Sequence, residues 1–246
     1  MKKIRIFLAN EDLQLGSEIE VEGNNFEYLS RVMRQRIGDK IFVFNGVDGE
    51  FLAELNSITK KSLNIRIIQK ISDLKKVANI TLAFALIKGA RIDYIAEKAT
   101  ELGVARFQPI ITQHTISDKI NYERFRANVK EACEQCERND FPEIVEVKKL
   151  EKFLLTSEAI ILFCDESGKG EKASSILDKI KNLEEFLRQE IVILIGPEGG
   201  FSEDEFCKIR KLKNCYSLSL GPRILRADTA VVAALALVQE FLGDFN

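Results

Sequence analysis

The sequence predicts an α/β protein: a small β-rich barrel followed by a larger unit built on a parallel sheet. Apolar and polar residues alternate with period two in the first part, as in IRIFL and KIFVF. Beyond a polar stretch near residue 72, short apolar strands alternate with helical patterns, which is typical of a parallel sheet covered on both faces. We therefore expect a first domain over residues 1–72 and a second over 73–246.

The first part contains two more strand patterns, DGEFLAEL and SLNIRIIQK. Gly38-Asp39 and Asn45-Gly46 are turn signals between strands. Residues 26–36 lie between strands and are expected to form one short helix.

The second part alternates strands with helices. Ser202 and Glu205 form the capping-box pattern S-x-x-E, which marks a helix start. Gly103 and Gly243 follow helical patterns and are expected to end them. The expected strands are 80–86, 104–111, 143–147, 159–164, 191–195 and 215–220, and the expected helices are 89–103, 121–138, 203–213 and 225–242.

Composition excludes several classes of protein. The chain has 246 residues, with 46% hydrophobic and 30% charged, as in ordinary soluble globular proteins. No apolar run approaches the roughly 20 residues that a membrane helix needs, so we expect a cytoplasmic protein without a membrane partner. The five cysteines do not suggest a disulfide framework. Cys133-x-x-Cys136 falls within a predicted helix without a second pair, so we expect two small residues on one helical face and no metal site.

Three glycine-containing loops follow apolar strands of the second part. They are FCDESGKG after Phe163, IGPEGGF (195–201) and LSLGPRILRADTA (218–230). Ligands of parallel sheets bind beyond the carboxyl ends of the strands, and glycine lets a ligand approach the backbone closely. We therefore expect a ligand site here, the alternative being simple tight turns. The nucleotide fingerprints G-x-G-x-x-G and G-x-x-x-x-G-K-[ST] do not occur, which disfavours a nicotinamide-dependent dehydrogenase.

Charged residues of these loops are candidates for chemistry. Glu198 would repel a phosphate and suits a neutral or cationic ligand, or it is only a favourable acid at a helix start. Arg226 follows an apolar pair and is the better candidate than Arg223 for stabilising negative charge; the alternative is a solvated salt bridge. In the first part, a basic set could contact phosphates, or form an ordinary solvated face: Arg5, Arg31, Arg34 and Arg36.

The second and third loops resemble the signature of RNA methyltransferases of the SPOUT superfamily, whose α/β domain contains a deep trefoil knot. The sequence is most similar to the family that methylates ring nitrogen 3 of a uridine in 16S ribosomal RNA. KGARIDYIAEKATELGV (88–104), ACEQCERN (132–139) and YLSRVMRQRIGDKIFVFNG (28–46) also resemble it, so the similarity spans nearly the whole chain.

This resemblance implies a PUA-like RNA-binding barrel at residues 1–72 and a knotted methyltransferase domain at 73–246 that forms a homodimer. It also implies S-adenosylmethionine bound by the three loops and 16S ribosomal RNA of the small subunit as partner. Arg226 and Glu198 are the expected catalytic residues. The expected cofactor contacts are Phe163, Gly196, Pro197, Glu198, Gly199, Gly200, Leu218, Leu220, Gly221, Ile224, Leu225 and Arg226.

The sequence departs from the family pattern at a few positions. Ala227-Asp228 replaces a more usual Thr-Glu pair, and Tyr28 stands where histidine is common. His114 stands where arginine is common, and Phe125 replaces a tryptophan. Two alternatives stay open: a non-catalytic RNA-binding factor of ribosome assembly, and an enzyme of the same fold that methylates another RNA or a ribose 2′-hydroxyl.

Overall fold

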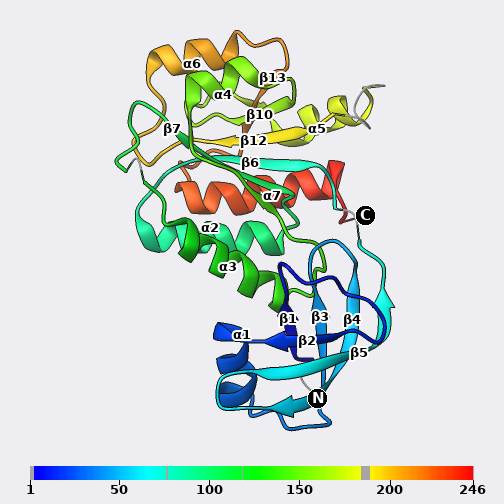
Figure 1. Cartoon of the computed structure of the whole chain (residues 1–246). Coiled ribbons are helices and arrows are strands. Elements are labelled where there is room, and N and C mark those ends of the chain that lie inside the picture. The colour runs from blue at the N-terminus through cyan, green and yellow to red at the C-terminus, as the bar shows by residue number, and fades with distance from the viewer. Residues whose placement is uncertain (1–2, 76, 118, 184–188, 246) are drawn as a thin grey trace. The chain divides into compact units, whose positions relative to one another are not determined.

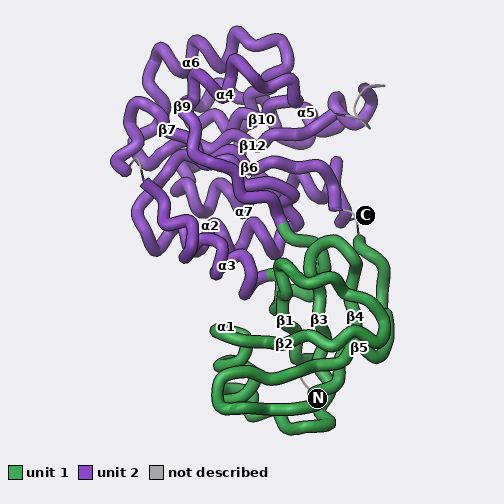
Figure 2. Tube along the Cα trace, viewed as in Figure 1, with its two compact units in different colours: residues 1–76, 133–141 green, residues 77–132, 142–246 purple. Residues whose placement is uncertain are grey.

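The computed structural model describes residues 3–75, 77–117, 119–183 and 189–245 and divides the chain into two compact units (Figures 1 and 2). The first unit comprises Met1–Lys76 and Cys133–Phe141, and the second comprises Val77–Ala132 and Pro142–Asn246.

The first unit contains a five-stranded sheet in the order β1-β3-β4-β5-β2. Strand β1 pairs parallel with β3 and the other pairs are antiparallel. Alternate residues of these strands enter one apolar core, so the predicted period-two strands are confirmed. The strands are β1 (Arg5–Phe7), β2 (Glu18–Val21), β3 (Lys40–Phe44), β4 (Glu50–Ile58) and β5 (Leu63–Ser72).

The predicted helix at residues 26–36 is shorter and begins earlier. Helix α1 (Gly23–Glu27) continues into one π-helical turn, η1 (Tyr28–Val32). The helical path ends before Arg34, whose φ of 53° lies in the left-handed region. Phe26 and Leu29 anchor the segment in the core of the unit.

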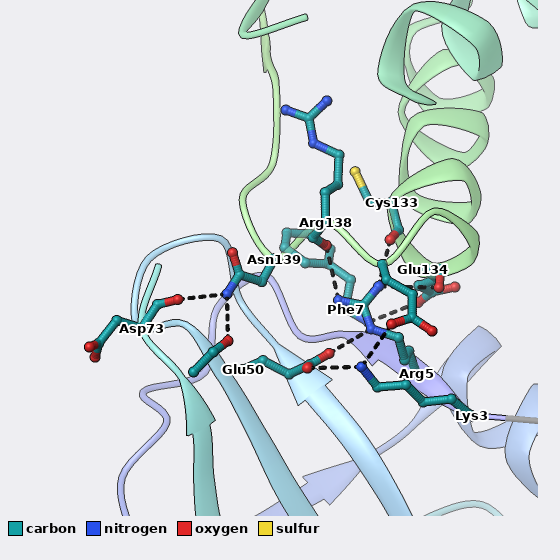
Figure 3. Close-up of polar contacts among 11 residues, drawn as sticks. Lys3, Arg5, Phe7, Glu50, Asp73, Cys133, Glu134, Arg138 and Asn139 are labelled. Carbon is teal, nitrogen blue, oxygen red and sulfur yellow. Dashed lines mark hydrogen bonds and ion pairs between the residues drawn. The ribbon is translucent and has the colours of Figure 1, made fainter. Parts of the chain in front are cut away.

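Arg5 joins the first strand to the segment 133–141 (Figure 3). Its Nε donates to Glu50 Oε1 at 2.6 Å. Its Nη atoms donate to the carbonyl oxygens of Cys133, Glu134 and Arg138 at 2.7, 3.2 and 3.0 Å. Because the Arg5 side chain is only 1% exposed, it is not available to an RNA phosphate. The predicted RNA contact of Arg5 is therefore wrong.

Three further contacts hold the same segment. The Asn139 amide donates to Ser72 Oγ at 3.1 Å and to the Asp73 carbonyl at 2.9 Å, and the rings of Phe141 and Phe7 stack at 4.4 Å. Residues 133–141 thus belong to the first unit, whereas the predicted boundary at residue 72 placed them in the second domain. The chain returns to the first unit through contacts between residues that are far apart in the sequence, and local sequence patterns do not reveal such contacts.

Cys133 is fully buried in this segment. Burial raises the pKa of its thiol to about 12, so the sulfur stays protonated at neutral pH. A protonated, buried thiol is a poor metal ligand and nucleophile, which supports the interpretation of Cys133 and Cys136 as packing residues.

The second unit is built on a parallel sheet in the order β11-β13-β10-β12-β6-β7-β8, with β9 also paired to β7. Helices cover both faces of the sheet, as predicted: α2 and α7 lie on one face and α4 and α6 on the other (Figure 1). The strands are β6 (Ile80–Ala85), β7 (Arg106–Ile111), β8 (Glu143–Ile144), β9 (Lys148–Lys149), β10 (Ile160–Cys164), β11 (Glu171–Lys172), β12 (Ile191–Ile195) and β13 (Cys215–Ser219). The helices are α2 (Gly89–Glu101), α3 (Tyr122–Gln135), α4 (Leu150–Thr156), α5 (Ala173–Lys181), α6 (Glu203–Arg210) and α7 (Ala227–Leu242).

Local signals mark several of these elements correctly. The Ser202–Glu205 capping box opens α6 with both of its reciprocal hydrogen bonds, and Gly103 follows α2 with a φ of 76°. The short elements α4, α5, β9 and β11 were not predicted. The knot stays a prediction, since it concerns the path of the chain and not the strand order. Within the described ranges, no helix is both long and apolar enough to cross a membrane.

Replacing Arg5 with Met should lower the free energy of unfolding by about 3 kcal/mol, because Glu50 would keep its buried charge with Lys3 as its remaining partner and without Arg5, the closer one. Urea denaturation followed by circular dichroism measures this loss. Arg31→Ala is the matched control; the Arg31 side chain is 71% exposed, so stability should change by less than about 1 kcal/mol. Equal stability of both variants would contradict the role given to Arg5.

Candidate functional site

Three adjacent parallel strands bring the three predicted loops together. β10 pairs with β13 on one side and with β12 on the other, with Cys164 opposite Leu218 and Phe163 opposite Leu194. Their carboxyl ends therefore share one edge of the sheet. A pocket of about 530 Å³ lies there, within the second unit. Its lining residues are Arg91, Cys164, Asp165, Glu166, Gly168, Ile195, Gly196, Pro197, Glu198, Ser219, Leu220, Gly221, Pro222, Arg223, Ile224, Leu225, Arg226, Ala227 and Ala230.

Most of the predicted cofactor contacts line this pocket, namely Gly196, Pro197, Glu198, Leu220, Gly221, Ile224, Leu225 and Arg226. Phe163 and Leu218 do not line it. Both lie inside strands and are buried in the sheet, since they precede the loops. Gly199 and Gly200 also lie outside the lining, in the turn that leads to α6.

The GPEGGF loop is shaped by close packing around its glycines. A Cβ at Gly196 would lie 2.6 Å from the ring of Phe201, a buried residue. Gly200 has a φ of 70°, and a Cβ there would collide with the Glu166 carboxylate. The same carboxylate accepts a hydrogen bond from the Phe201 N–H at 3.2 Å. The glycines are thus required by the path of the loop and by its neighbours.

Glu198 forms an ion pair with Arg91, a residue of the first turn of α2. The Nε of Arg91 also lies 4.0 Å from Asp228 Oδ2 in the first turn of α7. Arg91 therefore links the pocket loop to two helix starts. Sequence reasoning missed it, although it lies in the KGARID motif that carries part of the family resemblance.

Two acids follow β10 and were not predicted individually. Asp165 is buried, which would raise its pKa, but hydrogen bonds from Ser167 and Arg210 outweigh burial and lower the pKa below its usual range. The Arg210 Nη2 lies 2.5 Å from Asp165 Oδ2. For Glu166 the balance is opposite: partial burial raises the pKa of its carboxyl, although the Phe201 N–H opposes this. Asp165 is thus a structural anion, and Glu166 is the more basic carboxylate.

Arg226 is the N-cap residue of α7, and it lines the pocket together with Arg223. Both residues are exposed, and among the described residues neither joins an ion pair. The salt bridge that was the alternative for these arginines is formed by Arg91 instead. Two guanidinium groups are thus free to contact a ligand.

The remaining predicted RNA contacts, Arg31, Arg34 and Arg36, are exposed on the first unit. Arg31 forms a surface ion pair with Glu27 at 2.9 Å. Arg34 and Arg36 lie in the segment that connects η1 to β3. Among the described residues, no cluster of three or more histidine, cysteine or acidic side chains is arranged to hold a metal.

Two family models cover most of the chain. Residues 74–239 match an RNA methyltransferase domain, and residues 21–68 match an RNA methyltransferase PUA domain. Together with the pocket at the ends of the parallel strands, these matches define the class: an RNA methyltransferase with a PUA domain.

Two relatives identify the family within this class. A ribosomal RNA small subunit methyltransferase E from Rickettsia conorii is 36% identical over 97% of this chain and 96% of its own length. The enzyme of that name from Bacillus subtilis is 26% identical, with 97% of this chain and 96% of its own length covered. The chain belongs to the ribosomal RNA small subunit methyltransferase E family.

Solved structures agree with this family. The Neisseria gonorrhoeae methyltransferase E, bound to S-adenosyl methionine, has a TM-score of 0.87 at 28% identity, and all of both chains is covered. A methyltransferase from Legionella pneumophila in complex with the same cofactor has a TM-score of 0.87 at 30% identity, again over all of both chains.

Gly196→Ala should destabilise the protein by about 1–3 kcal/mol, because the added methyl group must displace the Phe201 ring in a packed interior. Gly89→Ala at the start of α2 is the control, since no atom lies within 4 Å of a Cβ there. Thermal unfolding of the two variants side by side measures the difference. A Gly196→Ala protein as stable as the control would show that the loop does not need glycine at this position.

Proposed function

We propose that the protein transfers a methyl group from S-adenosylmethionine to ring nitrogen 3 of a uridine in 16S ribosomal RNA. The observation that carries the proposal is the pocket formed by three loops at one sheet edge, in a chain whose full length aligns with relatives bound to this cofactor. The proposal includes a homodimer formed through the second unit, the small ribosomal subunit as partner, and a cytoplasmic location.

The pocket suits this cofactor in size and charge. Its volume of about 530 Å³ falls within the range of small-molecule sites. Gly221 has a φ of 108° with no atom within 4 Å of a Cβ position, so a ligand can approach its backbone. The lining carries both acids and arginines, among them Glu166, Glu198 and Arg223, which suits a cofactor that has a cationic sulfur and a carboxylate. We assign the adenosine moiety to the backbone of residues 196–198 and 220–225.

When bound, S-adenosylmethionine supplies a methyl group activated by the positive charge of its sulfur. The protein's task is then to orient the uridine and to favour loss of its N3 proton. That loss leaves negative charge on the base, chiefly on its two carbonyl oxygens. The exposed guanidinium of Arg226, which forms no ion pair with the described residues, is suited to stabilise it. The base must leave its stack to reach such a pocket.

Glu198 lines the proposed cofactor site and is the second candidate catalytic residue. Arg91 contacts its Oε1, and this ion pair favours the charged form of the carboxylate. The proton acceptor is then Glu198 or a water molecule. In the first unit, the exposed Arg31, Arg34 and Arg36 would hold the RNA backbone.

Arg226→Ala should reduce methyl transfer by roughly 10²–10³-fold, the usual cost of removing one group that stabilises a developing anion. Its dissociation constant for S-adenosylmethionine should change less than about threefold, because this role arises only in the transition state. Single-turnover assays and calorimetry measure the two quantities. Arg223→Ala in the same loop is the control. Near-normal transfer by Arg226→Ala would remove this residue from the mechanism.

The function itself is tested with labelled S-adenosylmethionine and small subunits from cells that lack the enzyme. The expected product is a methyl group on nitrogen 3 of a single uridine. A methylated ribose would replace the proposal with 2′-hydroxyl methylation. Binding of the subunit without transfer would favour a non-catalytic assembly factor.

A further inference from the structure

His114 contacts the loop that forms one wall of the pocket. Its Nδ1 lies 3.2 Å from the Gly199 carbonyl oxygen and 3.1 Å from the Gly200 carbonyl oxygen. Carbonyl oxygens only accept hydrogen bonds, so Nδ1 must carry the proton and donate to both. The side chain itself is exposed, so it is not needed to fill a core.

The turn that carries His114 is ordered and meets the loop at a second point. The Thr112 N–H donates to Thr115 Oγ1 at 2.9 Å, which closes the turn after β7. The Gln113 N–H donates to Glu205 Oε1 at 2.8 Å, and Glu205 is the acid of the capping box. Residues 113 and 114 thus hold both the glycine turn and the helix start that follows it.

Glu166 holds the same turn from another side. Its carboxylate accepts the Phe201 N–H, whereas His114 donates to the two preceding carbonyls. The peptide groups of Gly199, Gly200 and Phe201 are therefore held by side chains from the ends of β7 and β10. These residues directly follow Pro197 and Glu198, which line the pocket.

The hydrogen bonds that hold this turn also affect ligand binding. A Gly-Gly step is the most flexible dipeptide in the chain and costs the most conformational entropy to order. A loop that is already ordered before the ligand arrives loses less entropy on binding. We propose that His114 is a positioning residue that orders the Gly199–Gly200 turn for cofactor binding; this inference rests on the proposed function.

The competing role for His114 is direct contact with RNA, since its side chain is exposed. The two roles differ in what they change. If His114 orders the turn, its loss alters the affinity for S-adenosylmethionine in the absence of RNA. An RNA contact alters the KM for the small subunit and leaves cofactor affinity unchanged.

The experiment compares wild type, His114→Ala and His114→Asn. Isothermal titration with S-adenosylmethionine, without RNA, should show affinity reduced by roughly three- to tenfold in His114→Ala, the effect of losing one exposed hydrogen bond. His114→Asn should stay within about twofold of wild type, because its amide nitrogen can donate from nearly the place of Nδ1. Hydrogen exchange of the ligand-free protein should be faster in residues 199–201 of His114→Ala only.

Unchanged cofactor affinity and unchanged exchange in His114→Ala would overturn the inference, and a raised KM for the subunit would then assign His114 to RNA. Wild-type protein that binds no S-adenosylmethionine would instead overturn the proposed function, and the inference with it. Urea unfolding of all three proteins separates either result from loss of fold, since an exposed residue should shift stability little.

Discussion

The parallel alignment of β13, β10 and β12 is the constraint on which the rest of the second unit depends. Hydrogen bonding in register places three strand ends side by side, and the loops that leave them must turn away within a few residues. Glycine permits these turns in two ways. Gly200 and Gly221 adopt a positive φ, and Gly196 leaves room for the ring of Phe201. The pocket is therefore a product of the sheet, since most of its lining residues belong to the loops that leave these three strands.

The acids and the arginines around this pocket differ in whether they have partners within the protein. The acids are engaged within the protein: Asp165 with Arg210, Glu198 with Arg91, and Glu166 with the Phe201 N–H. Arg223 and Arg226 lack ion pairs among the described residues. In the proposed reaction a cationic donor meets a base that becomes anionic, and Arg226 would stabilise that anion.

Local patterns predicted much of this structure. Strand alternation, the capping box and the three loops after apolar strands depend on neighbouring residues, and each appears where it was expected. Local patterns do not predict contacts between residues that are far apart in the sequence. The sequence predicts Arg5 as part of a basic RNA-binding set, but Glu50 and the carbonyls of the segment 133–141 surround it. Arg91 and His114 likewise acquire their roles only through loops about a hundred residues away.

The central claim is that the three loops form one cofactor site. The most direct test is a crystal structure of the protein with S-adenosylmethionine. We expect the adenosine moiety to lie against the backbone of residues 196–198 and 220–225, with the sulfonium methyl group facing Arg226. Cofactor bound outside this pocket, or within it with the methyl group turned away from Arg226, would contradict the account.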